Sequence, residues 1–268
     1  MARKIRLDVH LLTKGFVESR QMAQRLIRAG KVKKINGELL DKPGQLVEES
    51  LEIIISEKPR FVSRGGDKLQ FANEIFQISF ENRVCLDIGV STGGFTDCLL
   101  QNGASLVYSI DVGYGQTAWE IRQNPKVVLI ERTNIRKTSE EDIFKANDLR
   151  PDCFVVDVSF ISLTMVLKSI INLLEGEDLE GIVLIKPQFE VGKYQVSKGG
   201  VVNDPKSHLF VLEKIIDFCI GLDWAVNDLI PSPLVGPAGN HEYLLWISKN
   251  KKVEKKLDLR EIVKSVLN

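Results

Sequence analysis

A short segment of the chain joins an apolar run to an acid, a glycine-rich turn and the start of a helix. Residues 85–97 read Cys-Leu-Asp-Ile-Gly-Val-Ser-Thr-Gly-Gly-Phe-Thr-Asp. Glycine has no Cβ, so backbone N–H groups of such a turn can approach a ligand closely, and the helix N-terminus adds partial positive charge. A second apolar run, residues 106–110, ends on Asp111, and an acid there can accept hydrogen bonds from ribose hydroxyls. The pattern predicts a nucleoside-binding site.

The spacing of the glycines narrows the choice of nucleoside. They stand at positions 89, 93 and 94, which is not the G-x-G-x-x-G of dinucleotide-binding proteins, and no Gly-Lys-Ser/Thr of a P-loop follows. The spacing therefore disfavours a nicotinamide oxidoreductase. S-adenosylmethionine carries a ribose and an adenine but no phosphate, and it is the favoured ligand. The alternative is a glycine-rich turn that binds nothing.

Four charged residues flank other apolar runs and could carry out chemistry. Asp157 and Lys186 each follow such a run, Glu242 precedes another, and Lys68 lies upstream of all of them. A lysine directly after a buried strand is costly unless it is paired or functional. Two lysines and two acids that converge on one cleft would neutralise one another. The residues alone leave two interpretations open, an inert ion-pair cluster and a catalytic site.

Apolar runs alternate with helical patterns from residue 83 onward. Strands are expected at 83–88, 106–111, 127–130, 153–158, 181–186, 224–230 and 242–248, and helices at about 94–102, 116–123, 139–147, 161–174, 204–220 and 251–267. Such alternation is typical of a parallel sheet with helices on its faces. The link over 231–239 is too rich in proline and glycine for a helix, so the last two strands should be antiparallel. We therefore predict a Rossmann-like α/β sheet, mostly parallel, in which the carboxyl ends of the strands line a cleft.

Composition is typical of a globular protein without membrane spans. The chain has 268 residues, of which 44% are hydrophobic and 27% charged, enough for one large and one small domain. No apolar run approaches the ~20 residues of a membrane helix, and the N-terminus lacks the apolar core of a signal peptide. The four cysteines are widely spaced and the three histidines scattered, so we expect reduced core cysteines, no metal site and a cytoplasmic location.

The net charge is zero, but the first part of the chain is strongly basic. Residues 3–34 hold ten basic side chains and two acidic ones. Helical patterns at 6–14 and 20–29 are followed by strands at 31–35 and 51–55, with an Asn-Gly turn at 36–37, which predicts a small α+β unit. A basic module joined to an acidic body suggests a polyanionic partner, although a solvated helix face would give the same pattern.

The basic module resembles the S-four RNA-binding module, named after a ribosomal protein. The resemblance rests on Arg6-Leu7-Asp8, Gly15, Ser19-Arg20, Ala23, Ile27, Gly30-Lys31-Val32, Asn36-Gly37 and Lys42-Pro43-Gly44. It implies that the second helix and the following loop bind structured RNA, mainly through phosphates. The implied RNA face comprises Arg6, Arg20, Arg25, Arg28, Lys31, Lys33 and Lys34.

Nearly the whole chain resembles the TlyA family of ribosomal RNA 2′-O-methyltransferases, which are often labelled haemolysins. The motifs are Val62-Ser63-Arg64-Gly65-Gly66, Ser91-Thr92-Gly93-Gly94-Phe95-Thr96-Asp97, Asp111-Val112-Gly113-Tyr114-Gly115-Gln116, Glu131-Arg132-Thr133-Asn134, Asp157-Val158-Ser159-Phe160-Ile161-Ser162-Leu163, Lys186-Pro187-Gln188-Phe189-Glu190 and Gly236-Pro237-Ala238-Gly239-Asn240. The resemblance implies an RNA-binding domain at 1–58, a linker at 59–62 and an FtsJ-like class I methyltransferase domain at 63–268.

The resemblance also implies roles for individual residues. Lys68, Asp157, Lys186 and Glu242 match the Lys-Asp-Lys-Glu tetrad of FtsJ-type enzymes, with Lys186 accepting or steering the proton of a ribose hydroxyl, with cytidine as the implied nucleoside. The implied S-adenosylmethionine site comprises Asp87, Gly89, Ser91, Thr92, Gly93, Gly94, Phe95, Asp111, Asn134 and Asp157. The implied partners are ribosomal RNA and the ribosomal subunits, without integral membrane association.

Two further functions stay open at this point. The family label suggests a membrane-active haemolysin, for which the basic tail from Lys249 onward is the candidate segment. A ribosome-binding factor without catalytic activity would also use the basic module.

Overall fold

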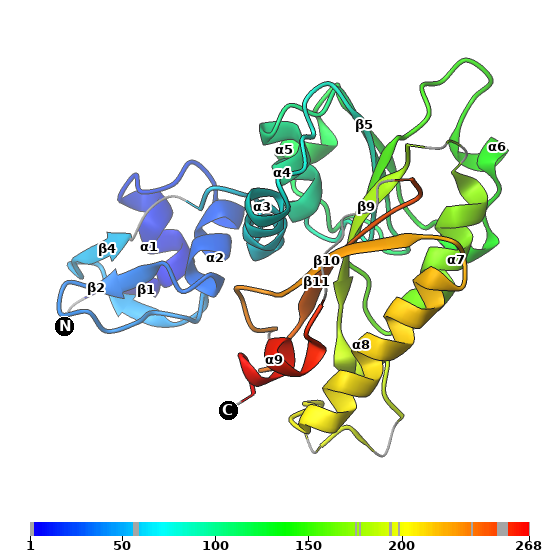
Figure 1. Cartoon of the computed structure of the whole chain (residues 1–268). Coiled ribbons are helices and arrows are strands. Elements are labelled where there is room, and N and C mark those ends of the chain that lie inside the picture. The colour runs from blue at the N-terminus through cyan, green and yellow to red at the C-terminus, as the bar shows by residue number, and fades with distance from the viewer. Residues whose placement is uncertain are drawn as a thin grey trace. The chain divides into compact units, whose positions relative to one another are not determined.

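The chain divides into two compact units, Met1–Arg64 and Gly65–Asn268. The computed structural model describes residues 3–55, 59–174, 176, 178–192, 195–197, 199–236, 238–250 and 257–267. The finer domain boundaries predicted above, at 58 and 62, stay predictions. Figure 1 shows the elements of each unit.

The first unit packs two helices against short strands. Its elements are β1 (Lys4–Arg6), α1 (Leu7–Thr13), α2 (Arg20–Arg28), β2 (Val32–Lys34), β3 (Leu46–Glu48) and β4 (Ile53–Ile55). β1 pairs with β3 and β2 with β4, both antiparallel. The side chain of Ser19 accepts a hydrogen bond from the Met22 N–H and caps α2, as the sequence predicts. Leu7, Leu11, Leu26, Ile27 and Val32 are fully buried and form the core.

The second unit is built on one seven-stranded sheet. Its strands are β5 (Val84–Ile88), β6 (Leu106–Ile110), β7 (Val127–Ile130), β8 (Cys153–Val156), β9 (Glu180–Ile185), β10 (Ala225–Pro231) and β11 (Tyr243–Ser248). They lie in the order β10-β11-β9-β8-β5-β6-β7. β5 to β9 pair in parallel, and β11 is antiparallel to both β9 and β10. The predicted Rossmann-like sheet and its antiparallel last pair are confirmed.

Helices cover both faces of this sheet. They are α3 (Arg64–Phe76), α4 (Gly94–Gln101), α5 (Trp119–Arg122), α6 (Glu140–Ile143), α7 (Leu163–Leu173), α8 (Pro205–Ile220), α9 (Leu259–Lys264) and the 3₁₀ turns η1 (Ile135–Lys137) and η2 (Pro187–Phe189). In Figure 1, α3, α4 and α5 lie on one face and α6, α7 and α8 on the other. Every residue of β5, β8 and β9 is buried, as expected for strands covered on both faces.

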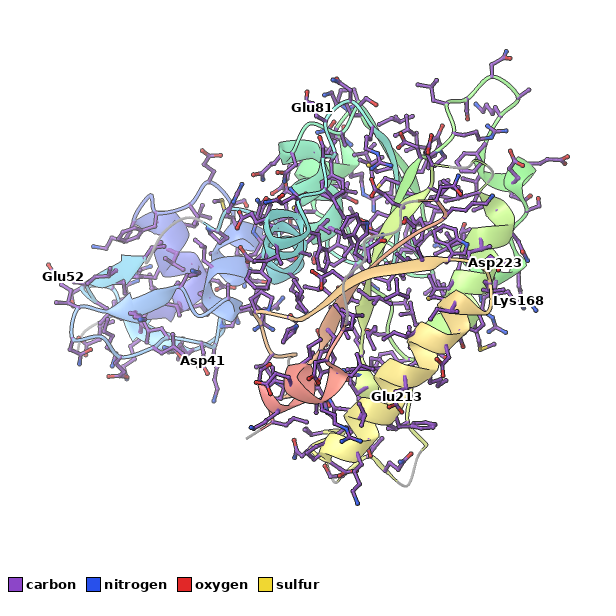
Figure 2. All side chains as sticks on the ribbon, viewed as in Figure 1. Asp41, Glu52, Glu81, Lys168, Glu213 and Asp223 are labelled. Carbon is purple, nitrogen blue, oxygen red and sulfur yellow. The ribbon has the colours of Figure 1, made fainter. Side chains whose placement is uncertain are left out.

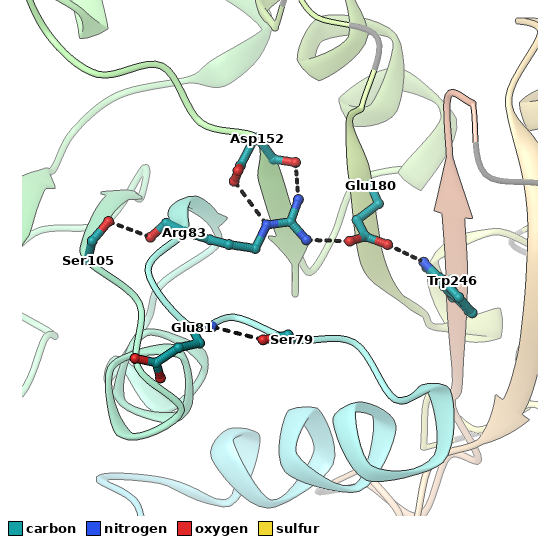
Figure 3. Close-up of polar contacts among 7 residues, drawn as sticks. All are labelled: Ser79, Glu81, Arg83, Ser105, Asp152, Glu180 and Trp246. Carbon is teal, nitrogen blue, oxygen red and sulfur yellow. Dashed lines mark hydrogen bonds and ion pairs between the residues drawn. The ribbon is translucent and has the colours of Figure 1, made fainter.

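A polar cluster ties together the amino ends of the central strands (Figure 3). Arg83, which precedes β5, donates to the Asp152 carboxylate at 3.0 Å and pairs with Glu180, the first residue of β9. The Nε1 of Trp246 in β11 donates to the other Glu180 oxygen at 3.1 Å. Glu180 is 2% exposed, so its charge depends on these partners. The cluster fixes the strand register at the edge opposite to the predicted cleft.

Several elements differ from the sequence expectations. Arg6 closes the strand β1 instead of opening a helix, because the first segment pairs with β3, which the sequence analysis missed. The helices expected at 116–123 and 139–147 have only one turn each, 119–122 and 140–143. The helix α3 was not predicted, since it begins at a Gly-Gly pair. Of the helix expected at 251–267, α9 is observed, and 251–256 lie outside the described residues.

The described residues show no disulfide, no membrane-spanning helix and no group of side chains that could hold a metal ion. All four cysteines are buried and none forms a disulfide. In the described part of the chain, no helix is long and apolar enough to cross a membrane. No group of three or more histidine, cysteine or acidic side chains among the described residues could hold a metal ion.

Candidate active site

The glycine-rich turn between β5 and α4 needs glycine for geometric reasons. Gly89 has φ +90°, and a Cβ there would lie 2.3 Å from the backbone oxygen of Asp157. Gly93 has φ +95° and directly precedes α4. Both values lie in the left-handed region that side chains disfavour. The turn therefore brings the end of β5 against the end of β8, and it exposes Ser91 and Thr92 at the edge of the sheet.

Asp87 lies beneath this turn and has no exposed surface. Its Oδ2 accepts a hydrogen bond from the Thr96 hydroxyl at 2.6 Å, and Thr96 also contacts the Ser109 hydroxyl at 2.8 Å. Burial raises the pKa of Asp87 to about 7, and the charges of Asp157 and Asp111 act in the same direction. Asp87 therefore supports the turn from inside, and its predicted part in cofactor binding stays a prediction. Phe95 is also buried, in the first turn of α4.

Asp111 joins the glycine-rich turn to the loop after β6. Its two carboxylate oxygens accept hydrogen bonds from the N–H groups of Ser91, at 2.7 Å, and Gly113, at 2.6 Å. The loop returns to the turn, because Thr117 donates to the Ser91 carbonyl and the Ala118 N–H to the Thr92 carbonyl. Asp111 is half-buried, and a carboxylate can accept about four hydrogen bonds, so ribose hydroxyls can still bind to it.

Residues that follow β7 lie next to the loop after β6, at the carboxyl ends of the parallel strands. Glu131 accepts two hydrogen bonds from the Arg122 guanidinium, at 2.9 and 2.6 Å, and one from the Gly115 N–H. The Arg122 pairing lowers the pKa of the Glu131 carboxyl. Asn134 is exposed and its side chain caps η1 by accepting from the Arg136 N–H. Its amide is thus held at the same edge as Asp111.

Two lysine–carboxylate pairs lie at the other half of this edge. Lys186 Nζ is 2.5 Å from Asp157 Oδ1, and Lys68 Nζ, on α3, is 2.5 Å from Glu242 Oε2. Tyr243 in β11 is opposite Ile185 in β9, so Glu242 and Lys186 extend the same pair of strands. The two lysine side chains are each 11% exposed, and Glu242 is 3% exposed as a residue. Side chains from four separate segments are thereby paired at the predicted edge.

Two neighbours of these pairs escaped the sequence analysis. The hydroxyl of Ser159 accepts a hydrogen bond from Lys186 Nζ at 3.0 Å. Asn240 is 3% exposed, accepts from the Val202 N–H and donates to the Gly200 carbonyl, which fixes the loop before Glu242. Ser159 stands two residues after Asp157, within the same family motif, and that place in the sequence is the signal that could have drawn attention to it.

Arg6, Arg20 and Lys34 of the predicted RNA face are held in ion pairs, and the Arg6 and Arg20 side chains are nevertheless 45% and 51% exposed. Arg6 and Arg20 both donate to Asp8, which is completely buried, at 2.9 to 3.0 Å. The Arg6 guanidinium holds the pKa of the Asp8 carboxyl well below its usual range. Lys34 pairs with Glu38 at 2.7 Å. The other implied contacts are the exposed Arg28 and Lys33 and the half-buried Arg25 and Lys31.

Comparison with known proteins adds family evidence to this geometry. The FtsJ-like methyltransferase model matches residues 61–249, and the S4 domain model matches residues 5–53. The 16S/23S rRNA (cytidine-2′-O)-methyltransferase TlyA of Mycobacterium tuberculosis is 44% identical over 249 residues, which cover 92% of this chain and 91% of that protein. Hemolysin A of Brachyspira hyodysenteriae is 40% identical over 240 residues, 90% of this chain and 98% of that one.

A solved structure shares the complete fold. The hemolysin-labelled protein of Streptococcus thermophilus superposes with a TM-score of 0.75 at 37% identity, covering 99% of this chain and 96% of that one. The methyltransferase match spans the sheet that carries both lysine–carboxylate pairs. The S4 match spans the basic unit. The chain therefore belongs to the FtsJ-like methyltransferase family and, within it, to the TlyA group.

Proposed function

We propose that this methyltransferase transfers a methyl group from S-adenosylmethionine to the ribose 2′-hydroxyl of a cytidine in ribosomal RNA. The observation that carries the proposal is the pairing of Lys186 with Asp157 and Lys68 with Glu242 at the edge that also bears the glycine-rich turn. Because the proposed substrate is ribosomal RNA, the proposed location is the cytoplasm and the proposed partners are the ribosomal subunits.

The cofactor would lie across the glycine-rich turn and the loop after β6. The turn fits this ligand because a Cβ at Gly89 would strike the Asp157 backbone and because Asp111 keeps acceptor capacity at a half-buried position. Gly89, Ser91, Thr92, Gly93 and Gly94 would hold the methionine end. Asp111 would bind the ribose, and Asn134 would lie near the adenine. When bound, S-adenosylmethionine supplies an electrophilic methyl group on a sulfonium centre.

The chain's own residues would orient the acceptor and handle its proton. Lys186 lies at the end of β9, where it can receive the proton of the 2′-hydroxyl or stabilise the charge that develops on the oxygen. Asp157 anchors Lys186. Lys68, held by Glu242, is the second cation at this edge and would orient the RNA. Because the pairs are mostly buried, they are preorganised, and positioning of the ribose supplies a large part of the rate enhancement.

Asp111→Ala should weaken binding of S-adenosylhomocysteine by about tenfold, because hydrogen bonds between a carboxylate and the ribose hydroxyls are lost. The measurement is calorimetric titration of the full chain. Asp217→Ala, which removes an exposed carboxylate on α8, is the control for a change of charge and should bind as the wild type does. Unchanged affinity of the Asp111 variant would place the ribose elsewhere.

The basic unit would dock the RNA through phosphate contacts. Arg28→Glu combined with Lys33→Glu should weaken RNA binding and flatten its salt dependence by about 1 to 2 units of the log–log slope, since each phosphate contact contributes roughly 0.7 to 0.9. Binding is measured over a range of salt concentrations. The control, Lys14→Glu with Lys42→Glu, makes the same change of charge at other exposed positions of this unit. Equal slopes for the two double variants would show that net charge alone attracts the RNA.

The substrate is tested by mapping 2′-O-methylated cytidines in ribosomal RNA from cells with and without the protein. A methylated site that depends on the protein and is lost with Lys186→Ala supports the proposal. The proposal is contradicted if the same set of cytidines is methylated in cells with and without the protein. Dye release from liposomes, measured on the same preparation, tests the membrane-active alternative.

A further inference from the structure

The side-chain nitrogen of Lys186 contacts two acceptor atoms, one in an ion pair and one in a hydrogen bond. Asp157 Oδ1 lies 2.5 Å from Nζ and Ser159 Oγ lies 3.0 Å from it. Both acceptors come from the segment directly after β8, and Lys186 directly follows β9. The two strands are parallel neighbours, so both segments leave the sheet at the same edge.

The contacts of Lys186 Nζ determine which of its positions stays open to a substrate. Besides its carbon, a charged lysine nitrogen has three N–H groups, whereas a neutral one has two N–H groups and a lone pair. Ser159 accepts a hydrogen bond from Lys186, and the Asp157 carboxylate forms an ion pair with the same nitrogen. With one N–H group on Ser159 and the Asp157 carboxylate beside the nitrogen, the position that stays open is the one that differs between the two protonation states. It holds an N–H when the lysine is charged and the lone pair when it is neutral.

We propose that Ser159 is a positioning residue whose hydrogen bond, together with the ion pair to Asp157, directs this open position of Lys186 at the ribose 2′-oxygen. This inference rests on the function proposed above. For the reaction, the Lys186 ammonium first releases one proton to solvent. The hydroxyl proton then passes to the lone pair of Nζ as the oxygen–methyl bond forms and the methyl–sulfur bond breaks. The positive charge of the sulfonium thereby ends on the lysine, and the sulfur leaves as a neutral thioether. Ser159 acts through Lys186 and does not itself contact the ribose.

The residue after Ser159 has an unusual backbone conformation. Phe160 has φ +64°, which is uncommon for a bulky residue, and its side chain is 90% exposed. Its ring lies 4.8 Å from that of Phe189, three residues after Lys186. The segments that carry Ser159 and Lys186 therefore contact each other a second time, beyond the hydrogen bond.

Glu190, which follows Lys186 along the chain, also holds together the segment after β8 and the segment after β9. Its carboxylate, in a residue that is 8% exposed, accepts hydrogen bonds from the Leu163 N–H at 2.5 Å and from the Ser162 hydroxyl at 2.8 Å. Lys214 on α8 pairs with it at 2.8 Å. The loop after β8 is thus fixed to the turn after β9, so the distance between Ser159 and Lys186 is set by buried contacts.

The kinetic test compares Ser159→Ala, Ser159→Thr and a control, Ser169→Ala, whose exposed hydroxyl on α7 bonds only within its own helix among the described contacts. Ser159→Ala should lower kcat for methyl transfer to ribosomal RNA by about 10- to 100-fold, the range for a hydrogen bond to a charged group. KM for RNA and the affinity for S-adenosylhomocysteine should change less than about twofold. Ser159→Thr keeps the oxygen and should restore most of the rate. Wild-type kcat in Ser159→Ala, or a threonine variant as slow as the alanine variant, would overturn the inference.

A second measurement tests the orientation of Lys186 without turnover. In protein labelled with ¹⁵N-lysine, the ammonium signal assigned by its loss in Lys186→Ala should be sharp in the wild type and in Ser159→Thr. It should broaden in Ser159→Ala, because that ammonium exchanges hydrogen with water faster. An unchanged signal in Ser159→Ala would overturn the inference. A wild type that shows this signal pattern but methylates no ribosomal RNA would count against the proposed function alone.

Discussion

Lys186→Ala is expected to lower the rate of methyl transfer by about 10²- to 10⁴-fold, the usual effect of removing a positioned proton acceptor or charge stabiliser. The affinity for S-adenosylhomocysteine should stay within a few-fold, because Lys186 is assigned to the ribose oxygen. The side chain of Asp157 is 22% exposed, so water can replace its lost partner. The measurement is single-turnover methyl transfer with calorimetric titration of the cofactor product. Near-full activity would refute the assignment of all four charged residues.

Lys186→Arg separates the two ways in which Lys186 can act. Arginine keeps the charge but cannot accept a proton near neutral pH. Substantial activity of Lys186→Arg would establish charge stabilisation, whereas activity as low as that of Lys186→Ala would favour proton acceptance. The matched control is Lys168→Ala, an exposed lysine on α7 that Figure 2 shows on the outside of this helix, and it should be as active as the wild type.

The sheet could be predicted from the sequence because its signals are local. Each parallel strand is a continuous apolar run, and turn residues and helical patterns separate the runs. The link over 231–239 has no room for a crossover helix, so the antiparallel pairing of the last two strands could be predicted. Polar residues directly after such strands, Asp111, Asp157 and Lys186, must lie at one edge of the sheet, so the place of the site followed from the order of the elements.

The partners within the site could not be predicted, because they depend on distant contacts. Lys68 pairs with Glu242, 174 positions away, through a helix whose Gly-Gly start hid it from pattern analysis. The sequence assigns Arg6 to RNA, whereas the fold brings its guanidinium onto the buried Asp8. Ser159 stands in one of the motifs that carry the family resemblance, but nothing in the motif points to its contact with Lys186. Side-chain pairing across elements is a tertiary property, and residue types alone leave several pairings open.

The burial of Asp87 is another tertiary property that the residue types do not reveal. It predicts a large effect of pH on the free energy of unfolding. The sequence assigns Asp87 to the cofactor, but the fold buries it completely, with the Thr96 hydroxyl as its side-chain donor. Its pKa is raised from 3.8 to about 7 by burial. Between these two pH values Asp87 binds more protons in the folded protein than in the unfolded chain, so the contribution of Asp87 to the free energy of unfolding falls as pH rises from about 4 to about 7 and then levels off. The difference of about three pKa units corresponds to about 4 kcal/mol lost over this window.

Asp87→Asn should remove this loss, because the amide cannot ionise while its oxygen can still accept the hydrogen bond from Thr96. The expected result is a free energy of unfolding that falls by about 4 kcal/mol less than that of the wild type between about pH 4 and pH 7. Urea unfolding followed by tryptophan fluorescence reports on the second unit, since Trp119, Trp224 and Trp246 all lie there. Asp217→Asn, at an exposed position on α8, is the control and should follow the wild type. A wild-type pH dependence in Asp87→Asn would mean that Asp87 is ionised throughout this range, and that the turn above it is supported by a carboxylate and not by a carboxylic acid.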